Sequence, residues 1–218
     1  TNSHAGITAL NGGTSTSDGY APREYSLAFT RTPPYSRDNK VKIENVDLPA
    51  GNSPRTLMAW IKPNVNNLKG TIAKWGTDSW KNLNNVRIWE GRLNHHSHCF
   101  CDEKDGTGAI GDTVIEKDEW THIASTYDGT TRKLFINGQI DGENVVNLNT
   151  ITSNDDSRIL EIGSFGYAAD FDGLIDELQL WNVALSSYQI ESYMYQQPPA
   201  DHANLVGYWP LEAGAGSI

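Results

Sequence analysis

The sequence predicts an all-β protein in which two antiparallel sheets pack face to face, followed by one short C-terminal helix. Short runs rich in Val, Ile, Thr, Tyr and Trp recur roughly every 8–15 residues, separated by clusters of Gly, Asn, Asp and Pro, a pattern typical of antiparallel strands. The runs are numerous, and an open sheet of more than about ten strands curls or splits. We therefore expect one sandwich domain that spans residues 1–218.

The individual elements follow from local patterns along the chain. Asp128-Gly129 and Asn137-Gly138 favour positive φ on either side of Arg132–Ile136 and predict a tight meander. A capping box at Ser186-Ser187-Tyr188-Gln189 predicts the single helix, which ends before Pro198-Pro199. The candidate strands, in order, are Glu24–Thr30, Lys40–Val46, Arg55–Lys62, Gly70–Lys74, Asn85–Glu90, Arg92–Cys101, Trp120–Tyr127, Arg132–Ile136, Arg158–Ile162, Leu174–Trp181 and Asn204–Leu211.

Composition excludes several functions. The formal net charge of -10 would repel a phosphate backbone, so we expect no nucleic-acid partner. We also expect no membrane insertion, because no run approaches the roughly 18 consecutive apolar residues that a spanning helix needs. Cys99 and Cys101 are the only cysteines. With one residue between them on a strand they lie near the upper limit for a bridge, which favours thiols over a strained disulfide.

Three blocks of sequence stand out: Leu57–Ile61, then Trp120–Gly129 with Lys133–Gln139, then Ile162–Phe165 with Phe171–Asn182 and Ala184–Ser186. Together they resemble the laminin-G-like and pentraxin-like domains of the concanavalin A-like jelly-roll superfamily. The resemblance covers about residues 24–211 and implies two curved antiparallel sheets, frequent calcium binding, and ligand sites on the concave face or the rim loops. It also implies an extracellular location, secreted or at the cell surface.

The resemblance carries further expectations about structure. The segment Leu205–Leu211 resembles a C-terminal strand that lies beside the N-terminal strand. The pentraxin disulfide would fall near Met58-Ala59 and Ile123-Ala124, where this chain has no cysteine, which argues against close pentraxin kinship and a pentamer. Four bulky side chains are expected to fill the core between the sheets: Trp60, Trp120, Phe135 and Trp181.

Calcium is the expected cofactor, because this cation takes carboxylates and backbone carbonyls from irregular loops. Asp176 is the first candidate ligand, since it occupies the family's Gly-x-Ile-Asp-Glu motif, although it could instead cap neighbouring backbone amides. Asp38 and Asp172 are further candidates, with ordinary turns as the alternative. Asp176 and Glu177 are adjacent and should point to opposite faces of a strand, so they do not resemble the close carboxyl pair of a retaining hydrolase.

Two segments are candidate ligand surfaces. In Trp75–Asn82, the ring of Trp80 could stack on a sugar while Asp78, Lys81 and Asn82 bond its hydroxyl groups. Trp75 belongs either to this sugar-binding surface or to the core. In His95–Asp102, alternation predicts His96, His98 and Phe100 lining a groove. A zinc or copper site there is the alternative, but neither C-x-x-C nor H-x-x-x-H spacing occurs.

The leading hypothesis is a non-catalytic recognition module that binds carbohydrate, with calcium as a structural cofactor. A protein-adhesion or structural domain is the first alternative, and a glycoside hydrolase or polysaccharide lyase of the same fold is the second. The expected partner is a glycan or an extracellular, cell-surface protein, and the chain is expected to belong to a larger multidomain protein. These assignments rest on the resemblance together with the two candidate surfaces.

Overall fold

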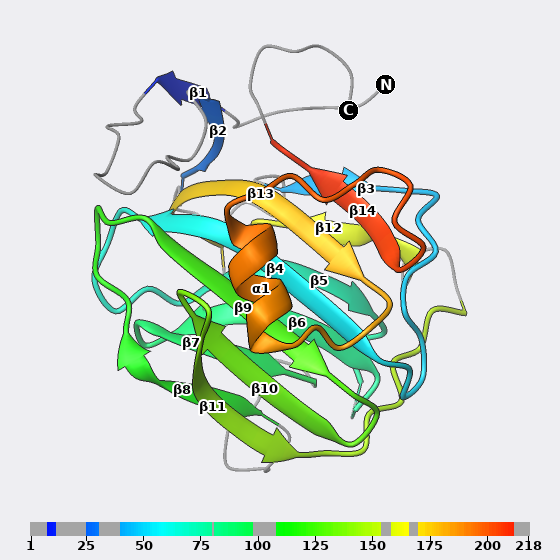
Figure 1. Ribbon diagram of the computed structural model, residues 1–218. Coiled ribbons are helices and arrows are strands. Elements are labelled where there is room, and N and C mark those ends of the chain that lie inside the picture. Colours follow the sequence, from blue (N-terminus) through cyan, green and yellow to red (C-terminus); the bar gives the residue numbers. More distant parts are fainter. Residues whose placement is uncertain are drawn as a thin grey trace.

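The computed structural model shows two antiparallel sheets stacked on one another and a single helix (Figure 1). It describes residues 8–11, 25–30, 40–79, 81–97, 108–153, 158–165 and 170–211. Asp38, Trp80, His98, Cys99 and Cys101 lie outside these ranges. The all-β sandwich expected from the sequence is confirmed.

The eight-stranded sheet has the order β1-β2-β13-β4-β9-β10-β11, and β14 pairs with β13. Neighbouring strands in it are antiparallel throughout. Met58 lies opposite Ala124 and Ala59 opposite Ile123, so the positions assigned to the pentraxin disulfide do face each other. The strands are β1 (Thr8–Asn11), β2 (Tyr25–Phe29), β4 (Arg55–Pro63), β9 (Thr121–Tyr127), β10 (Thr131–Ile136), β11 (Gln139–Val145), β13 (Gly173–Trp181) and β14 (Leu205–Trp209).

The six-stranded sheet packs behind the first one in the view of Figure 1 and has the order β3-β12-β5-β6-β7-β8. It begins at the short strand β3, which pairs with β12, and ends at β8. Its strands are β3 (Val41–Ile43), β5 (Gly70–Gly76), β6 (Leu83–Trp89), β7 (Arg92–His96), β8 (Ala109–Val114) and β12 (Leu160–Ile162).

Strand placement differs from expectation in two respects. Three strands, β1, β8 and β11, were not expected from the sequence. In addition, β14 pairs with β13 at Leu178–Trp181, whereas β2 pairs with β13 at Gly173–Ile175. The prediction that Leu205–Leu211 pairs with the N-terminal strand is therefore wrong: β14 and β2 follow one another along the same edge of β13.

The bulky anchors also lie elsewhere than expected. The core between the sheets is mainly aliphatic, with Phe29, Trp75 and Phe171 as its aromatic members. Phe135 and Trp181 instead form a second cluster with the helix residues Ile190 and Met194. This cluster covers the outer face of the eight-stranded sheet. Trp60 belongs to the same side, because its Nε1 donates a hydrogen bond to the helix carbonyl of Met194 at 3.1 Å.

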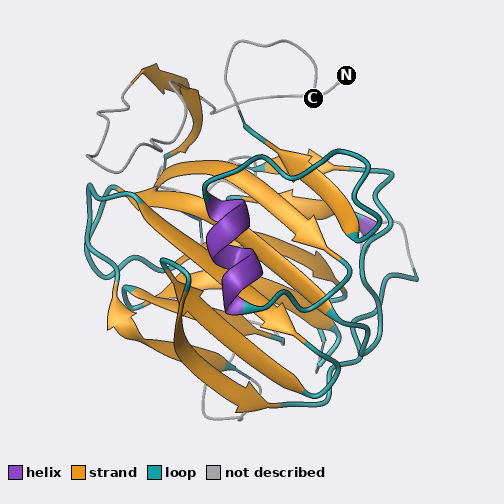
Figure 2. Ribbon diagram, in the orientation of Figure 1, coloured by secondary structure: helices purple, strands orange, loops and turns teal. Residues whose placement is uncertain are grey.

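The helix α1 (Ser187–Met194) lies across the outer face of the eight-stranded sheet (Figure 2). Its N-cap is Ser186, whose side chain accepts from the backbone N–H of Gln189, while the Gln189 side chain accepts from the backbone N–H of Ser186. The expected capping box is therefore confirmed. Within the described residues, none of the helical structure has the length and apolar character that spanning a bilayer requires.

Candidate functional site

The loop between β5 and β6 is held against the segment 149–151 by its own backbone. The carbonyl of Lys81 accepts from the N–H of Asn149 at 2.9 Å, and the carbonyl of Asn82 accepts from the N–H of Ile151 at 3.1 Å. Lys81 has φ of 60°, a value that turns the chain back toward β6. We call residues 76–79, 81, 82 and 149–151 the rim shelf.

Polar side chains are fixed on the rim shelf. The amide of Asn82 donates to Ser79 Oγ at 2.7 Å and accepts from the amide of Asn149 at 3.5 Å. Asp78 is exposed, and Lys81 and Asn82 are half-buried. Asp78, Lys81 and Asn82 lie in the loop between β5 and β6, and their role as sugar ligands stays a prediction. Trp80, the expected sugar-stacking ring, lies outside the described residues.

Trp75 does not belong to this surface. Its side chain is 1% exposed within the core between the sheets, and its Nε1 donates a hydrogen bond to the carbonyl of Pro49 at 2.9 Å. A β-bulge between Thr71 and Ala73 shifts the alternation of β5. Ala73 and Trp75 then share the inward face, so the ring of Trp75 cannot contact a ligand at the surface.

The histidine segment is buried as well. His95 faces the other sheet, where its Nδ1 shares a hydrogen bond with Ser125 Oγ of β9 at 2.6 Å. Burial, followed by the charges of Arg132 and Arg55, holds the pKa of His95 well below its usual value. His96 is 0% exposed, so its ring does not line an open groove as expected. His98 and Phe100 lie outside the described residues.

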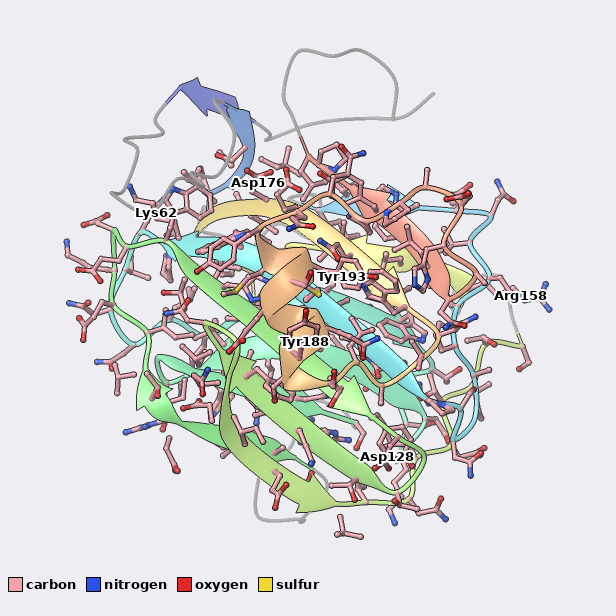
Figure 3. The ribbon with its side chains drawn as sticks, in the orientation of Figure 1. Lys62, Asp128, Arg158, Asp176, Tyr188 and Tyr193 are labelled. Carbon is pink, nitrogen blue, oxygen red and sulfur yellow. The ribbon has the colours of Figure 1, made fainter. Side chains whose placement is uncertain are left out.

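The two described candidate calcium ligands, Asp176 and Asp172, differ in burial and in hydrogen-bond partners. Asp176, on β13, is fully buried, and its Oδ1 accepts the backbone N–H of Glu177 at 2.9 Å (Figure 3). Asp172 is half-buried and accepts from the amide of Asn64 at 3.1 Å. Among the described residues, three or more His, Cys, Asp or Glu side chains do not gather anywhere as a metal cluster. Calcium takes six to eight oxygen ligands, so the described carboxylates would need carbonyls or other groups to complete a site.

The outer face of the six-stranded sheet carries a charge cluster that the sequence analysis missed. Glu161 of β12 forms ion pairs with Lys40 and with Lys74 of β5, each at 2.5 Å. Although burial raises the pKa of Glu161, the two lysines bring it below its ordinary value. Lys74 also lies 4.9 Å from the ring centroid of Phe165. Glu161 is far from Lys40 and Lys74 in the sequence, so their pairing could not be predicted from a local motif. The one available signal was the polar residue at every second position of these strands, which marks a solvent-facing side of the sheet.

A second polar group follows on the same face. Trp89 at the end of β6 has two cations over its ring, Arg87 at 4.2 Å and Lys69 at 4.4 Å. Arg87 Nε donates to Asn94 Oδ1 at 2.7 Å, and the Asn94 amide donates to the carbonyl of Ala109 at 2.9 Å. Arg87 and Asn94 are almost fully buried, which leaves the half-buried Trp89 and Lys69 as the accessible members.

The titration of the carboxylates bears on catalysis. A glycosidase acid needs a raised pKa to remain protonated at neutral pH. The pKa values of two carboxylates are lowered: that of Glu161, as above, and that of Asp128, which is lowered first by backbone hydrogen bonds from Thr131 and Thr130. Glu177 accepts a hydrogen bond from the Tyr208 hydroxyl.

Comparison with known proteins places this geometry in a family. Residues 36–191 match the Laminin_G_3 family, described as the concanavalin A-like lectin/glucanases superfamily. No curated protein matches the sequence. Among solved structures, a protein from Bacteroides ovatus has a TM-score of 0.64 at 18% identity. The match covers 83% of this chain and 51% of that one, so this chain spans about half the length of that protein.

Two further structures extend the comparison. One is domain 4 of AbnA, a GH43 extracellular arabinanase from Geobacillus stearothermophilus, in complex with arabinotriose. It has a TM-score of 0.61 at 19% identity, with 87% of this chain and 81% of that chain covered. The other is a heptameric SAP-like pentraxin from Limulus polyphemus, with a TM-score of 0.59, 18% identity and coverage of 85% and 88%. At such identities the likeness shows the fold.

Proposed function

The chain belongs to the concanavalin A-like lectin/glucanases superfamily, and from this premise we propose that it is a non-catalytic carbohydrate-binding module. The observation that carries the proposal is the rim shelf, where the amides of Asn82 and Asn149 are fixed beside the exposed Asp78. Planar amides and carboxylates bond sugar hydroxyls in pairs, and an aromatic ring supplies the apolar face. In this proposal Trp80, on the same loop, is that ring.

A glycan array, read with and without EDTA, tests the proposal. Trp80→Ala should weaken glycan binding about tenfold or more, by analogy with other aromatic stacking contacts. Asn82→Ala should weaken it too, because it removes one amide and releases Asn149. Asn66→Ala is the matched control, since Asn66 is exposed in the loop between β4 and β5. An array on which the folded protein binds nothing would refute the module.

Calcium, cellular context and location complete the proposal. We propose a structural calcium near Asp176, for which a higher unfolding temperature in calcium than in EDTA is the expected result. One solved relative is a domain of an extracellular arabinanase. That relative supports an extracellular location and membership of a larger multidomain protein.

A protein-adhesion domain is the second candidate. It is favoured by exposed apolar side chains on the edge strands of the two sheets, because clustered apolar surface marks contact sites. Ile140 and Val145 belong to β11, and Ile110 and Val114 belong to β8. If the glycan array is blank, Val145→Lys should abolish adhesion to extracellular protein in a solid-phase assay, and unchanged adhesion would refute this candidate.

A further inference from the structure

A cleft of about 490 Å³ opens beside α1, away from the rim shelf. It is lined by Asn137, from the β10–β11 turn, and by helix residues that include Tyr188, Glu191 and Tyr195. α1 lies on the outer face of the eight-stranded sheet (Figure 1). The rim shelf lies in the loop that joins β5 and β6 of the other sheet and shares no residue with the cleft.

The cleft has exposed aromatic rings at both ends. Tyr188 is 80% exposed and Tyr195 is 44% exposed, and Figure 3 shows Tyr188 on the helix in front of the sheet. Tyr188 lies in the first turn of α1 and Tyr195 is its C-cap, so the two residues are about 10 Å apart along the helix axis. Such a spacing suits an extended ligand that touches both rings.

The ring of Tyr195 and two polar groups of the cleft are held in place before any ligand binds. Tyr195 packs on Trp60 with ring centroids 6.3 Å apart. One carboxylate oxygen of Glu191 accepts from the amide of Gln139 at 2.7 Å, and Asn137 Oδ1 accepts from the backbone N–H of His122 at 2.9 Å. These bonds fix the orientation of both side chains. Among the described residues, Asn137 Nδ2 and the second Glu191 oxygen make no hydrogen bond, so both can meet a ligand.

The chemistry of the lining selects the ligand class. Glu191 is the only charged residue among those that line the cleft, and the whole chain carries a formal net charge of -10. An anionic sugar would be repelled here. Aromatic faces, an amide and a carboxylate match the apolar faces and hydroxyl groups of neutral sugars.

We propose that this cleft is a second carbohydrate site, which binds a neutral oligosaccharide chain through Tyr188 and Tyr195. It is independent of the rim shelf in position and in residues. With both sites engaged the module is bivalent, and a polymer that reaches both faces, or two polymer chains, would be held more tightly than by either site alone.

Isothermal titration of the full chain tests the second site. The neutral probes are arabinotriose, xylohexaose, cellohexaose and laminarihexaose, and the acidic probe is an alginate hexasaccharide. Tyr188→Ala should weaken binding of a neutral probe about tenfold, whereas Tyr188→Phe keeps the ring and should stay within about threefold. Both variants should keep the unfolding temperature of the original protein, because Tyr188 is exposed and its removal opens no cavity.

A parallel titration in the Asn82→Ala background separates the two sites. A Tyr188-dependent signal that survives Asn82→Ala supports the cleft, even if the rim shelf binds nothing. Loss of all binding with Asn82→Ala, together with no effect of Tyr188→Ala, overturns the cleft and leaves the proposed function standing. Preference of the cleft for the alginate probe, or failure of every neutral probe to bind, also overturns it.

Discussion

Lowering the pH from 7 to 5 should destabilise the fold through His122. This ring lies buried under α1, 5.3 Å from the ring centroid of Trp60, and its Nδ1 makes no hydrogen bond among the described residues. Burial lowers its pKa from 6.5 to about 3. The folded protein therefore keeps the imidazole neutral, and stability is lost as the pH falls from about 6.5 toward 3, where the unfolded chain binds a proton and the folded one does not.

The magnitude follows from that difference in pKa. One pKa unit corresponds to about 1.36 kcal/mol, so at pH 5 the free energy of unfolding falls by about 2 kcal/mol through His122. His95 adds a loss of the same sign, because its pKa is also lowered by burial. The pKa of Glu161 is lowered too, but its loss of stability begins only when the pH falls to the ordinary pKa of a carboxyl group. The change in unfolding free energy between pH 7 and pH 5 therefore comes mainly from the histidines.

Urea unfolding at the two pH values measures the effect. His122→Phe removes the titrating group and should reduce the loss between pH 7 and pH 5 by about 2 kcal/mol. Phe135→Leu is the control, because it alters the same cluster under α1 without touching a titrating group and should keep the full loss. The reasoning is refuted if His122→Phe loses as much stability over this interval as the original protein.

Three further changes test the packing. Trp181→Ala should lower the free energy of unfolding by about 3–5 kcal/mol in urea, since it empties the cluster under α1; a loss below 1 kcal/mol would contradict that placement. Glu161→Gln should cost about 1–3 kcal/mol at pH 7, because Lys40 and Lys74 lose their common partner, and an unchanged urea midpoint would count against the charge cluster. Gly142→Val should lower the melting temperature, since a Cβ there would lie 2.8 Å from the Ile110 carbonyl oxygen, whereas an unchanged melting temperature would mean that the strands separate easily.

Local signals account for the elements that the sequence predicted well. The capping box at Ser186 and the turn Asn137-Gly138, with φ of 49° and 81°, depend on residues within four positions of each other. Each of these signals is local, so it favours its helix start or turn independently of the tertiary structure. The helix, the strands β9 and β10 and the turn residues on either side of β10 could therefore be predicted.

Strands β8 and β11 were missed because their glycines resemble turn signals. Gly111 and Gly142 instead permit the two strands to approach closely, and Asp141 Oδ1 accepts from the backbone N–H of Thr113 at 3.0 Å. Such an approach between the edges of two sheets depends on tertiary structure. A pattern confined to one strand carries no sign of it.

In the candidate site, too, some features follow from local sequence and others depend on tertiary structure. The loop containing Asp78 and Asn82 follows from turn residues between two strands, so its position at the surface could be predicted. Whether Trp75 faced the ligand or the core depended on the bulge between Thr71 and Ala73, which reverses the side-chain direction. The helix cleft joins the turn at Asn137 to α1, a contact between elements separated by about fifty residues, and only the fold reveals it.

The family motif around Asp176 has a structural explanation that competes with calcium. A bulge interrupts the pairing of β13 with β4 between Asp176 and Gln179, and Glu177 has φ of 53°. The bulge coincides with the point where β14 replaces β2 along the other edge of β13. A backbone N–H that leaves a ladder needs another acceptor, and Asp176 Oδ1 provides one for Glu177.

Asp176→Asn separates the two roles, because asparagine keeps the acceptor oxygen but loses the negative charge. If Asp176 ligates calcium, the variant should lose the rise in unfolding temperature that calcium gives over EDTA, since a neutral amide is a weaker calcium ligand than a carboxylate. If the carboxylate serves only as a cap, the response to calcium and EDTA should match that of the original protein. Equal calcium responses of the two proteins, measured by calorimetry, would therefore remove Asp176 from the calcium proposal and leave the bulge as the reason for its position.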